Sequence, residues 1–272
     1  MNNKGILFRA VDWDNRSEEF EVVCAYFPTY LYRSQVPDNS LVIGRYSVLP
    51  FYKELEDELA FKNCILINSM EQHEYIADIC NYYQDIKDFT PKTYTQWGDI
   101  GDGRWVVKGK TNSRKFRWNT HMYAEGRSQL LDAIRNLHQD QMIADQGIVV
   151  REYVPLAKLG EGINGLPISK EWRCFCYKNN ILATGFYWGN FQELDPGSLP
   201  KGGLDFVQKI ADIISLKTNF FVIDVAEKED GGFIVIEIND GQQSGLSMVD
   251  PKELYSHLRD VLVGDLKDVL VD

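Results

Sequence analysis

The sequence predicts a chain of mixed fold class, in which a small α/β unit comes first and an α+β region of hairpins and helices follows. Through residues 1–88, short apolar runs alternate with amphipathic segments, which is typical of a parallel sheet with helical crossovers. From residue 89 onward, apolar runs come in pairs separated by polar turns, which predicts antiparallel hairpins. The 272 residues are enough for one large domain or two small ones.

The N-terminal unit is predicted from six periodic segments. The strands are expected at Ile6–Ala10, Glu21–Phe27, Leu41–Ile43 and Cys64–Ile67, and the helices at Pro50–Phe61 and His73–Tyr83. In a parallel sheet, ligands bind where the strands end. Arg45 and Asn68 follow two of these strands and are therefore candidate ligand contacts, although both are also ordinary turn residues.

A boundary is predicted at Phe89–Thr93, because Pro91 disfavours a helix at Thr90. Later elements are expected at Arg104–Lys108 (strand, after a short strand and the turn Gly98–Gly103), Gln129–Gln139 (helix), Gly147–Val150 (strand), Glu171–Tyr177 with Ile181–Trp188 (hairpin), Leu204–Leu216 (helix) and Pro251–Leu270 (one or two helices). The glycine-rich segment Leu159–Ile168 is expected to be a mobile loop. Arg173, inside a strand, is either a paired core charge or a site residue.

Five cations crowd ten residues of an otherwise acidic chain: Lys108, Lys110, Arg114, Lys115 and Arg117. Small polar residues between them predict a loop, and such a loop suits a phosphate group because cations and free backbone N–H groups both favour the anion. The alternative is a solvated basic loop. A Walker A loop is excluded, because Arg104 stands where its first glycine is required.

Two apolar runs, Phe220–Val225 and Phe233–Ile238, flank a polar Asp-Gly-Gly turn and predict a β-hairpin. Glu237 and Asn239 share one face of their strand, and Asp224 stands on the paired strand. Three oxygen-bearing side chains that converge in this way suit Mg²⁺ whose shell is completed by nucleotide phosphates. The alternative is an acidic hairpin with a solvated face.

Composition excludes several classes of function. The net charge of −11 argues against a long nucleic-acid surface. The apolar runs are strand-sized and no signal-peptide core is present, so we expect no membrane span and a cytoplasmic location. Five cysteines without a CxxC pair fit reduced thiols, with Cys174 and Cys176 in the core, and four histidines without ligand spacing argue against a zinc site.

The order of these segments resembles the ATP-grasp superfamily. The stretches that carry the resemblance are Thr-Pro-Lys-Thr, the Val-Val-Lys strand, the basic loop, Val-Val-Arg-Glu-Tyr-Val, Glu-Trp-Arg, and Asp followed across the hairpin by Glu-Ile-Asn. They span residues 89–250 and are most similar to the ATP-grasp group named for two arginines and a lysine. Glu-Trp-Arg and Glu-Ile-Asn are also similar to segments of ribosomal-protein glutamate ligases and D-alanine ligases. The resemblance implies an ATP-grasp fold with an α/β domain at 1–88, a lid lobe at 89–150 and a metal-bearing lobe at 151–272.

The resemblance also implies residue roles. Phosphate and lid contacts would come from Lys108, Lys110, Arg114 and Lys115, the hinge from Arg151, Glu152, Tyr153 and Val154 with adenine at the backbone of Glu152 and Val154, the ribose contact from Glu161, the γ-phosphate or acyl-phosphate contact from Arg173, and Mg²⁺ ligands from Asp224, Glu237 and Asn239. The lid carries arginines and lysine in place of a glycine-serine-rich loop. Asp240–Gly245 replaces a proline-glycine loop, which leaves the acceptor site unassigned.

These roles predict an ATP-dependent carboxylate–amine ligase. ATP would phosphorylate a carboxylate with the help of Mg²⁺, and an amine would attack the acyl phosphate to form an amide. The substrates are left open among peptides, protein termini, amino acids and metabolites, and a homodimer is also left open. Two alternatives stay on the same fold: a kinase-like phosphotransferase, and a nucleotide-binding module without turnover.

Overall fold

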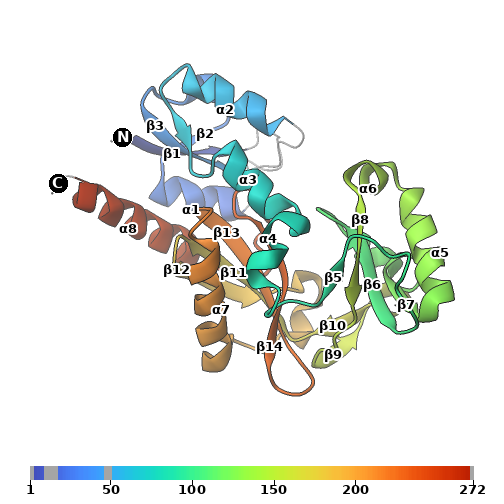
Figure 1. The fold of residues 1–272 in the computed structure, drawn as a ribbon. Helices are drawn as coiled ribbons and strands as arrows, with labels where there is room; N and C mark the ends of the chain where they lie inside the picture. The colour runs from blue at the N-terminus through green and yellow to red at the C-terminus, as the bar shows by residue number, and fades with distance from the viewer. Residues whose placement is uncertain (1–2, 9–17, 46–50, 270–272) are drawn as a thin grey trace.

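The computed structural model describes residues 3–8, 18–45 and 51–269 (Figure 1). The N-terminal unit is a parallel sheet with strand order β2-β1-β3-β4. Its strands are β1 (Asn3–Phe8), β2 (Thr29–Tyr30), β3 (Ser40–Arg45) and β4 (Ile65–Leu66), and its helices are α1 (Glu18–Tyr26), α2 (Tyr52–Ala60), α3 (Met70–Ala77) and α4 (Ile79–Ile86). The parallel order confirms the α/β prediction.

The next sheet lies in the segment predicted to be the lid lobe and is antiparallel, with order β5-β8-β6-β7. Its elements are β5 (Thr93–Tyr94), β6 (Arg104–Gly109), the short helical turns η3 (Lys115–Arg117) and η4 (Trp118–Met122), β7 (Tyr123–Glu125), α5 (Gly126–His138), α6 (Gln141–Gln146) and β8 (Ile148–Glu152). A core of its own, which includes Val107, Leu130, Ile134 and Val150, holds this lobe together.

The C-terminal lobe is a second antiparallel sheet, with order β12-β11-β13-β14. Its elements are β11 (Glu171–Tyr177), β12 (Asn180–Phe186), the 3₁₀ segment η6 (Gly189–Leu194), α7 (Lys201–Ile214), β13 (Phe220–Glu227), β14 (Phe233–Asp240) and α8 (Pro251–Val269), preceded by the hairpin β9 (Lys158–Glu161) and β10 (Pro167–Ser169). The antiparallel pairing in both lobes confirms the α+β prediction. Within the described ranges, no helix is long and apolar enough to cross a membrane.

Both faces of the C-terminal sheet are covered by helices. Trp172, Cys174 and Cys176 alternate with Phe175 and Tyr177 along β11, so they point to opposite faces. The first face packs against α3, α4 and α7. The second shares one core with β1, α1 and α8, so the N-terminal unit and the C-terminal lobe are joined, while the lid sheet lies to one side (Figure 1).

Three predicted elements are wrong. The Val-Val pair predicts a strand at Glu21–Phe27, but this segment lies largely in α1, where acidic residues occupy the first turn and Val22 and Val23 face the core. The single helix predicted at His73–Tyr83 is two helices, because Asp78 accepts a hydrogen bond from Cys80 N (2.8 Å) and begins α4. The loop predicted at Leu159–Ile168 contains the β9–β10 pairing. Predicted ends at Arg9-Ala10, Pro50 and Leu270 lie outside the described residues.

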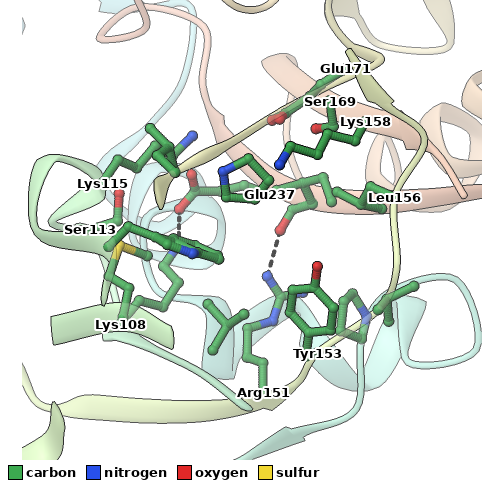
Figure 2. A pocket seen from close by; sticks show the side chains of 18 of the residues that line it. Lys108, Ser113, Lys115, Arg151, Tyr153, Leu156, Lys158, Ser169, Glu171 and Glu237 are labelled. Carbon is green, nitrogen blue, oxygen red and sulfur yellow. Dashed lines mark hydrogen bonds and ion pairs between the residues drawn. The ribbon is translucent and has the colours of Figure 1, made fainter. Parts of the chain in front are cut away.

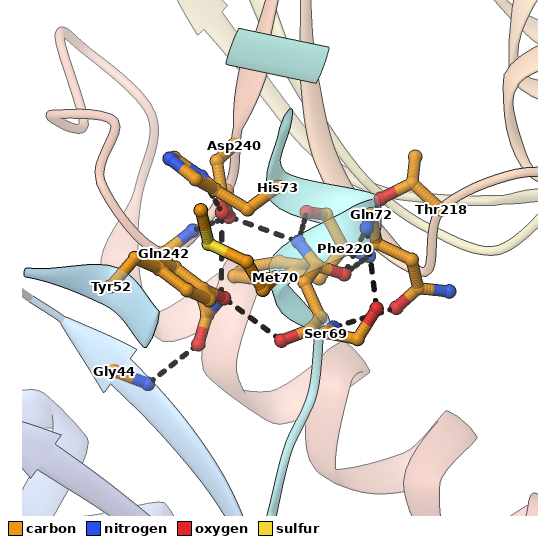
Figure 3. Close-up of polar contacts among 12 residues, drawn as sticks. Gly44, Tyr52, Ser69, Met70, Gln72, His73, Thr218, Phe220, Asp240 and Gln242 are labelled. Carbon is orange, nitrogen blue, oxygen red and sulfur yellow. Dashed lines mark hydrogen bonds and ion pairs between the residues drawn. The ribbon is translucent and has the colours of Figure 1, made fainter. Parts of the chain in front are cut away.

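A buried polar network joins the N-terminal unit to the end of β14 (Figure 3). The Asp240 carboxylate accepts a hydrogen bond from Asn68 Nδ2 (3.0 Å) and lies 2.9 Å from His73 Nδ1. Gln242 donates to Tyr52 Oη (2.6 Å) and accepts from Gly44 N (3.0 Å). Asn68 therefore serves the junction between units, and it does not line the cavity described below.

Arg45 has a similar role. Its Nη1 donates to Gly241 O (2.5 Å), and its Nη2 pairs with Glu19 (2.7 Å). The residue is buried, and it ties β3 and α1 to the segment that follows β14. The structure thus gives both polar residues at this sheet edge protein partners.

Candidate nucleotide site

A cavity lies between the lid lobe and the C-terminal lobe (Figure 2). Its lining comes from β6, the lid turns, the end of β8, the β9–β10 hairpin, β11 and β14. The polar members include Lys108, Ser113, Lys115, Arg151, Glu152, Tyr153, Lys158, Ser169, Glu171, Glu229 and Glu237. Val106, Met122, Leu156 and Ile236 are among the apolar residues of the wall.

Lys108 and Glu237 form an ion pair across the two lobes (Figure 2). Burial lowers the pKa of Lys108, and the nearby cations Arg151 and Lys115 lower it further, although Glu237 opposes this. Burial alone would raise the pKa of Glu237, but Lys108, Lys115 and Arg151 outweigh it and the pKa is lowered. Three cations thus lie around the Glu237 carboxylate, and together they would also attract a polyanion.

Arg151 connects the lid sheet to β14. The register shifts there, because Asp224 is opposite Glu237 while Val225 is opposite Val235, which leaves Ile236 unpaired. Arg151 Nη1 donates to the free carbonyl of Ile236 (2.6 Å), and Nη2 donates to Thr90 Oγ1 (2.6 Å). Arg151 therefore satisfies the carbonyl that the bulge leaves unpaired, next to Glu237.

The predicted metal ligands lie on neighbouring strands. Asp224 is directly opposite Glu237, and Asn239 follows two residues later. Asp224 is 1% exposed, and its two oxygens accept from Arg173 Nε (2.9 Å) and Nη2 (2.8 Å). The described residues contain no cluster of three His, Cys, Asp or Glu side chains that would hold a metal by themselves. Two carboxylates and an amide on adjacent strands nonetheless fit the oxygen preference of Mg²⁺, whose remaining ligands usually come from water and phosphate.

Tyr187 joins two cations at the edge of the cavity. Lys115 Nζ donates to Tyr187 Oη (2.6 Å) and lies 4.0 Å from the ring centroid, and Arg173 Cζ lies 4.9 Å from the same centroid. Burial opposes the charge of Lys115, but Tyr187, Glu171 and Glu237 outweigh it and raise its pKa. Lys115 is therefore a charged lid residue that already contacts the C-terminal lobe.

The lid cations split into two groups. Lys110 lies 3.8 Å from Asp78, and Arg114 makes a two-pronged pair with Asp140 (2.5 and 2.8 Å). Neither side chain lines the cavity, whereas Lys108 and Lys115 do. Of the basic residues that follow strand β6, Lys115 is thus the one that lines the cavity. The others pair within the lid or with Asp78, at the start of α4.

Glu171 lines the cavity, although the sequence reasoning gives it no site role. It is 2% exposed, its Oε1 has no hydrogen-bond partner among the described residues, and burial raises its pKa to about 7. Glu161, the predicted ribose contact, does not line the cavity; its side chain is 60% exposed and pairs with Lys158 (2.8 Å). Alternation along Glu-Trp-Arg would have placed Glu171 on the face of Arg173.

The predicted hinge lines the far end of the cavity. The N–H of Glu152 donates to Lys92 O and that of Tyr153 to Arg104 O, both at 2.9 Å. The N–H of Val154 has no backbone partner in the described part of the chain. The Glu152 side chain accepts a hydrogen bond from Tyr94 Oη (2.8 Å). The backbone of Glu152, and not its side chain, is therefore the candidate for a ligand contact.

The comparison with protein families decides the assignment. The matching family is described as an ATP-grasp domain, family 3 of the clade named for two arginines and a lysine, and it covers residues 96–258, more than half of the chain. The chain belongs to this family. A comparison with curated proteins finds no match.

Solved structures agree on the ATP-grasp fold. D-cycloserine synthetase DcsG is 11% identical, with a TM-score of 0.61 over 96% of this chain and 100% of the other. D-alanine–D-alanine ligase from Bacillus anthracis, solved with ATP, is 14% identical, with a TM-score of 0.58 over 96% and 95%. A RimK domain ATP-grasp protein from Sphaerobacter thermophilus is 13% identical, with a TM-score of 0.58 over 94% and 98%. The predicted fold and family are confirmed.

Proposed function

We propose that the protein is an ATP-dependent carboxylate–amine ligase that uses Mg²⁺ and an acyl-phosphate intermediate. The single observation that carries the proposal is the Lys108–Glu237 pair, which spans the cavity between two lobes of an ATP-grasp fold. Its structural relatives include several proteins described as ligases.

The cavity suggests how ATP would lie. The free N–H of Val154 and the backbone of Glu152 would meet the adenine edge. Glu171, with an unpartnered carboxylate oxygen, would accept from the ribose hydroxyls in place of Glu161. The cations Lys108, Lys115 and Arg151 would surround the phosphates, because their charge exceeds that of Glu237 alone.

Asp224, Glu237 and Asn239 would hold Mg²⁺, which when bound neutralises charge on the phosphates. Glu237 holds the Lys108 ammonium in place. A triphosphate would take over that ammonium and leave the Glu237 carboxylate to act as a ligand. Arg173 keeps Asp224 oriented through two parallel hydrogen bonds.

The chemistry then needs positioning and charge more than a protein nucleophile. A substrate carboxylate oxygen attacks the γ-phosphorus, and the bond from that phosphorus to the bridging oxygen breaks as ADP leaves. Lys115 and Arg173, brought together at Tyr187, would stabilise the charge on the transferring group. An amine nitrogen attacks the acyl carbon, phosphate leaves, and the proton of the amine is released to water.

The test replaces Glu237 by Gln. We expect ADP formation to fall by about a hundredfold or more, because a neutral amide binds Mg²⁺ more weakly than a carboxylate and leaves the charge of Lys108 unpaired. Glu253→Gln, at an exposed position on α8, is the control and should keep full activity. Full activity of Glu237→Gln would exclude this site.

Product analysis separates the ligase from its two alternatives. A ligase releases phosphate and an amide, a phosphotransferase leaves a phosphorylated product, and a binding module without turnover gives neither.

A further inference from the structure

A second cavity of about 550 Å³ adjoins the nucleotide cavity. The two share Ser113, Lys115, Leu166 and Trp188 as lining residues, so Lys115 and Trp188 form part of a common wall. Arg173 lies against Tyr187, which lines the second cavity, and its Nη1 donates to Gly245 O (2.7 Å). The cavity therefore lies where the γ-phosphate end of the nucleotide would meet a second substrate.

The wall of this cavity is aromatic. Its aromatic members are Phe116, Tyr187, Trp188 and Phe191. Trp188 and Phe191 pack against a small core made of Leu166, Ile168 and Phe186, which fixes their positions. Phe116 comes from the lid and is 74% exposed, so an apolar surface on the lid faces an apolar wall on the lobe. Such a wall favours a flat apolar group over a charged or small one.

The polar groups of the cavity select for one negative charge. Among the described residues that line it, Lys115 is the one that carries a charge, while Ser113, Asn190 and Ser247 are neutral. Trp188 Nε1 is a buried donor without a partner in the described chain, and Lys115 Nζ lies 4.9 Å from the Trp188 ring centroid. Lys115 can thus hold one carboxylate next to the nucleotide.

We propose that this cavity binds the substrate carboxylate, and that the substrate is a monocarboxylate with an aromatic group. The inference rests on the proposed ligase function and adds the class of its acyl substrate. The carboxylate lies at Lys115, and the aromatic group lies among Phe116, Trp188 and Phe191. A second acidic group has no cation to meet in this cavity, and a small aliphatic acid leaves the aromatic wall without contact.

Hydroxylamine replaces the unknown amine in the test. The activated carboxylate transfers its acyl carbon to the hydroxylamine nitrogen, the acyl C–O bond breaks, phosphate leaves and a hydroxamate forms. The acids are 3-phenylpropionate, phenylalanine, N-acetylphenylalanine, acetate, N-acetylalanine and N-acetylglutamate, each with ATP and Mg²⁺. We expect hydroxamate and ADP in equal amounts from aromatic members. Activity with N-acetylphenylalanine indicates a peptide C-terminus, whereas activity with phenylalanine alone indicates a free amino acid.

Two variants test the cavity itself. Asn190→Asp puts a second carboxylate into the cavity, and we expect kcat/KM for the aromatic acid to fall at least about tenfold. Gln192→Glu adds the same charge on the same 3₁₀ segment outside the lining and should change nothing. Phe191→Ala should raise KM for the aromatic acid about tenfold while Kd for ATP stays unchanged.

The outcomes separate this inference from the ligase proposal. Hydroxamate from acetate, N-acetylalanine or N-acetylglutamate but from no aromatic acid overturns the inference and leaves the ligase standing. Equal loss in Asn190→Asp and Gln192→Glu also overturns it. No hydroxamate from any acid, with ATP and Mg²⁺ shown to bind by calorimetry, overturns both.

Discussion

Strand β14 carries two carboxylates, Glu237 and Asp240, whose surroundings are opposite. Glu237 has one side-chain partner, Lys108 from another lobe, and lines a cavity. Asp240 accepts from Asn68 Nδ2 (3.0 Å) and Gln242 N (2.8 Å), lies 2.9 Å from His73 Nδ1, and lines no described cavity. Of the two carboxylates on this strand, Glu237 is thus the one whose oxygens keep capacity for a ligand.

The largest effect should follow from removing the cation that faces Glu237. Lys108→Met should lower kcat/KM for ATP by about a hundredfold to a thousandfold, because a buried cation beside the phosphates is lost. Lys108→Arg, which keeps the charge but not the shape, should recover part of the activity. Steady-state ADP release measures both. An unchanged kcat/KM in Lys108→Met would place the nucleotide elsewhere.

The same kind of substitution at Asp240 should act on folding. Asp240→Ala leaves buried donors of Asn68 and Gln242 without an acceptor, so we expect the free energy of unfolding to fall by about 3 kcal/mol. Glu237→Gln should lower it by less, because the amide oxygen can still accept a hydrogen bond from Lys108. Urea unfolding measures both. Equal losses in the two variants would remove the contrast between the two carboxylates.

Glu171 tests the contrast through pH. Its pKa is raised to about 7 from an ordinary 4.5, so the folded protein holds a proton that the unfolded chain has released. Stability from this group is present below pH 4.5, falls as pH rises, and is lost above about 7. Glu171→Gln cannot ionise and should raise Tm by about 5 °C at pH 8 while raising it less at pH 5.

ATP should favour the native chain over the Glu171→Gln variant. The ionised Glu171 is the better acceptor for ribose hydroxyls, so ATP should raise the Tm of the native chain at pH 8 more than that of Glu171→Gln. An equal ATP-induced shift in both chains would remove Glu171 from the nucleotide site.

The smallest effect is expected at Arg114. This residue pairs with Asp140 on a partly exposed part of the lid and does not line the cavity. Arg114→Gln should therefore lower the free energy of unfolding by less than about 1 kcal/mol. ADP release should stay within about threefold of native. A larger loss would mean that the lid closes further and brings Arg114 to the phosphates, as the sequence predicts.

The strands and hairpins are predictable because their cause is local. The apolar runs Phe220–Val225 and Phe233–Ile238 flank a polar turn, and the structure forms β13 and β14 there. The strand predicted at Glu21–Phe27 is wrong because the choice between strand and helix depends there on the burial of Val22 and Val23. That burial depends on residues distant in the chain, such as Tyr255. The local sequence pattern thus predicts most helices and strands, but it does not predict which segments are buried in the core.

The spacing of residues in the sequence does not predict where each side chain of the candidate site points. Three cations that are close in the chain have partners in three different places. Lys110 pairs with Asp78, Arg114 pairs with Asp140, and Lys115 donates to Tyr187. Glu171 is visible in Glu-Trp-Arg, and alternation would have found it. The aromatic wall is not visible, because η3 and η6 bring Phe116 and Phe191 together from distant segments.

The shared core of the N-terminal unit and the C-terminal lobe means that the unit of homology is not the unit of folding. The family match covers residues 96–258, which omits Ile6 and Phe8 on β1 and Leu262 on α8. All three belong to the same core as Phe175 and Val222. A chain cut to the matched residues would expose one apolar face of its central sheet to water and should aggregate, whereas the lid, with its separate core, would keep its packing.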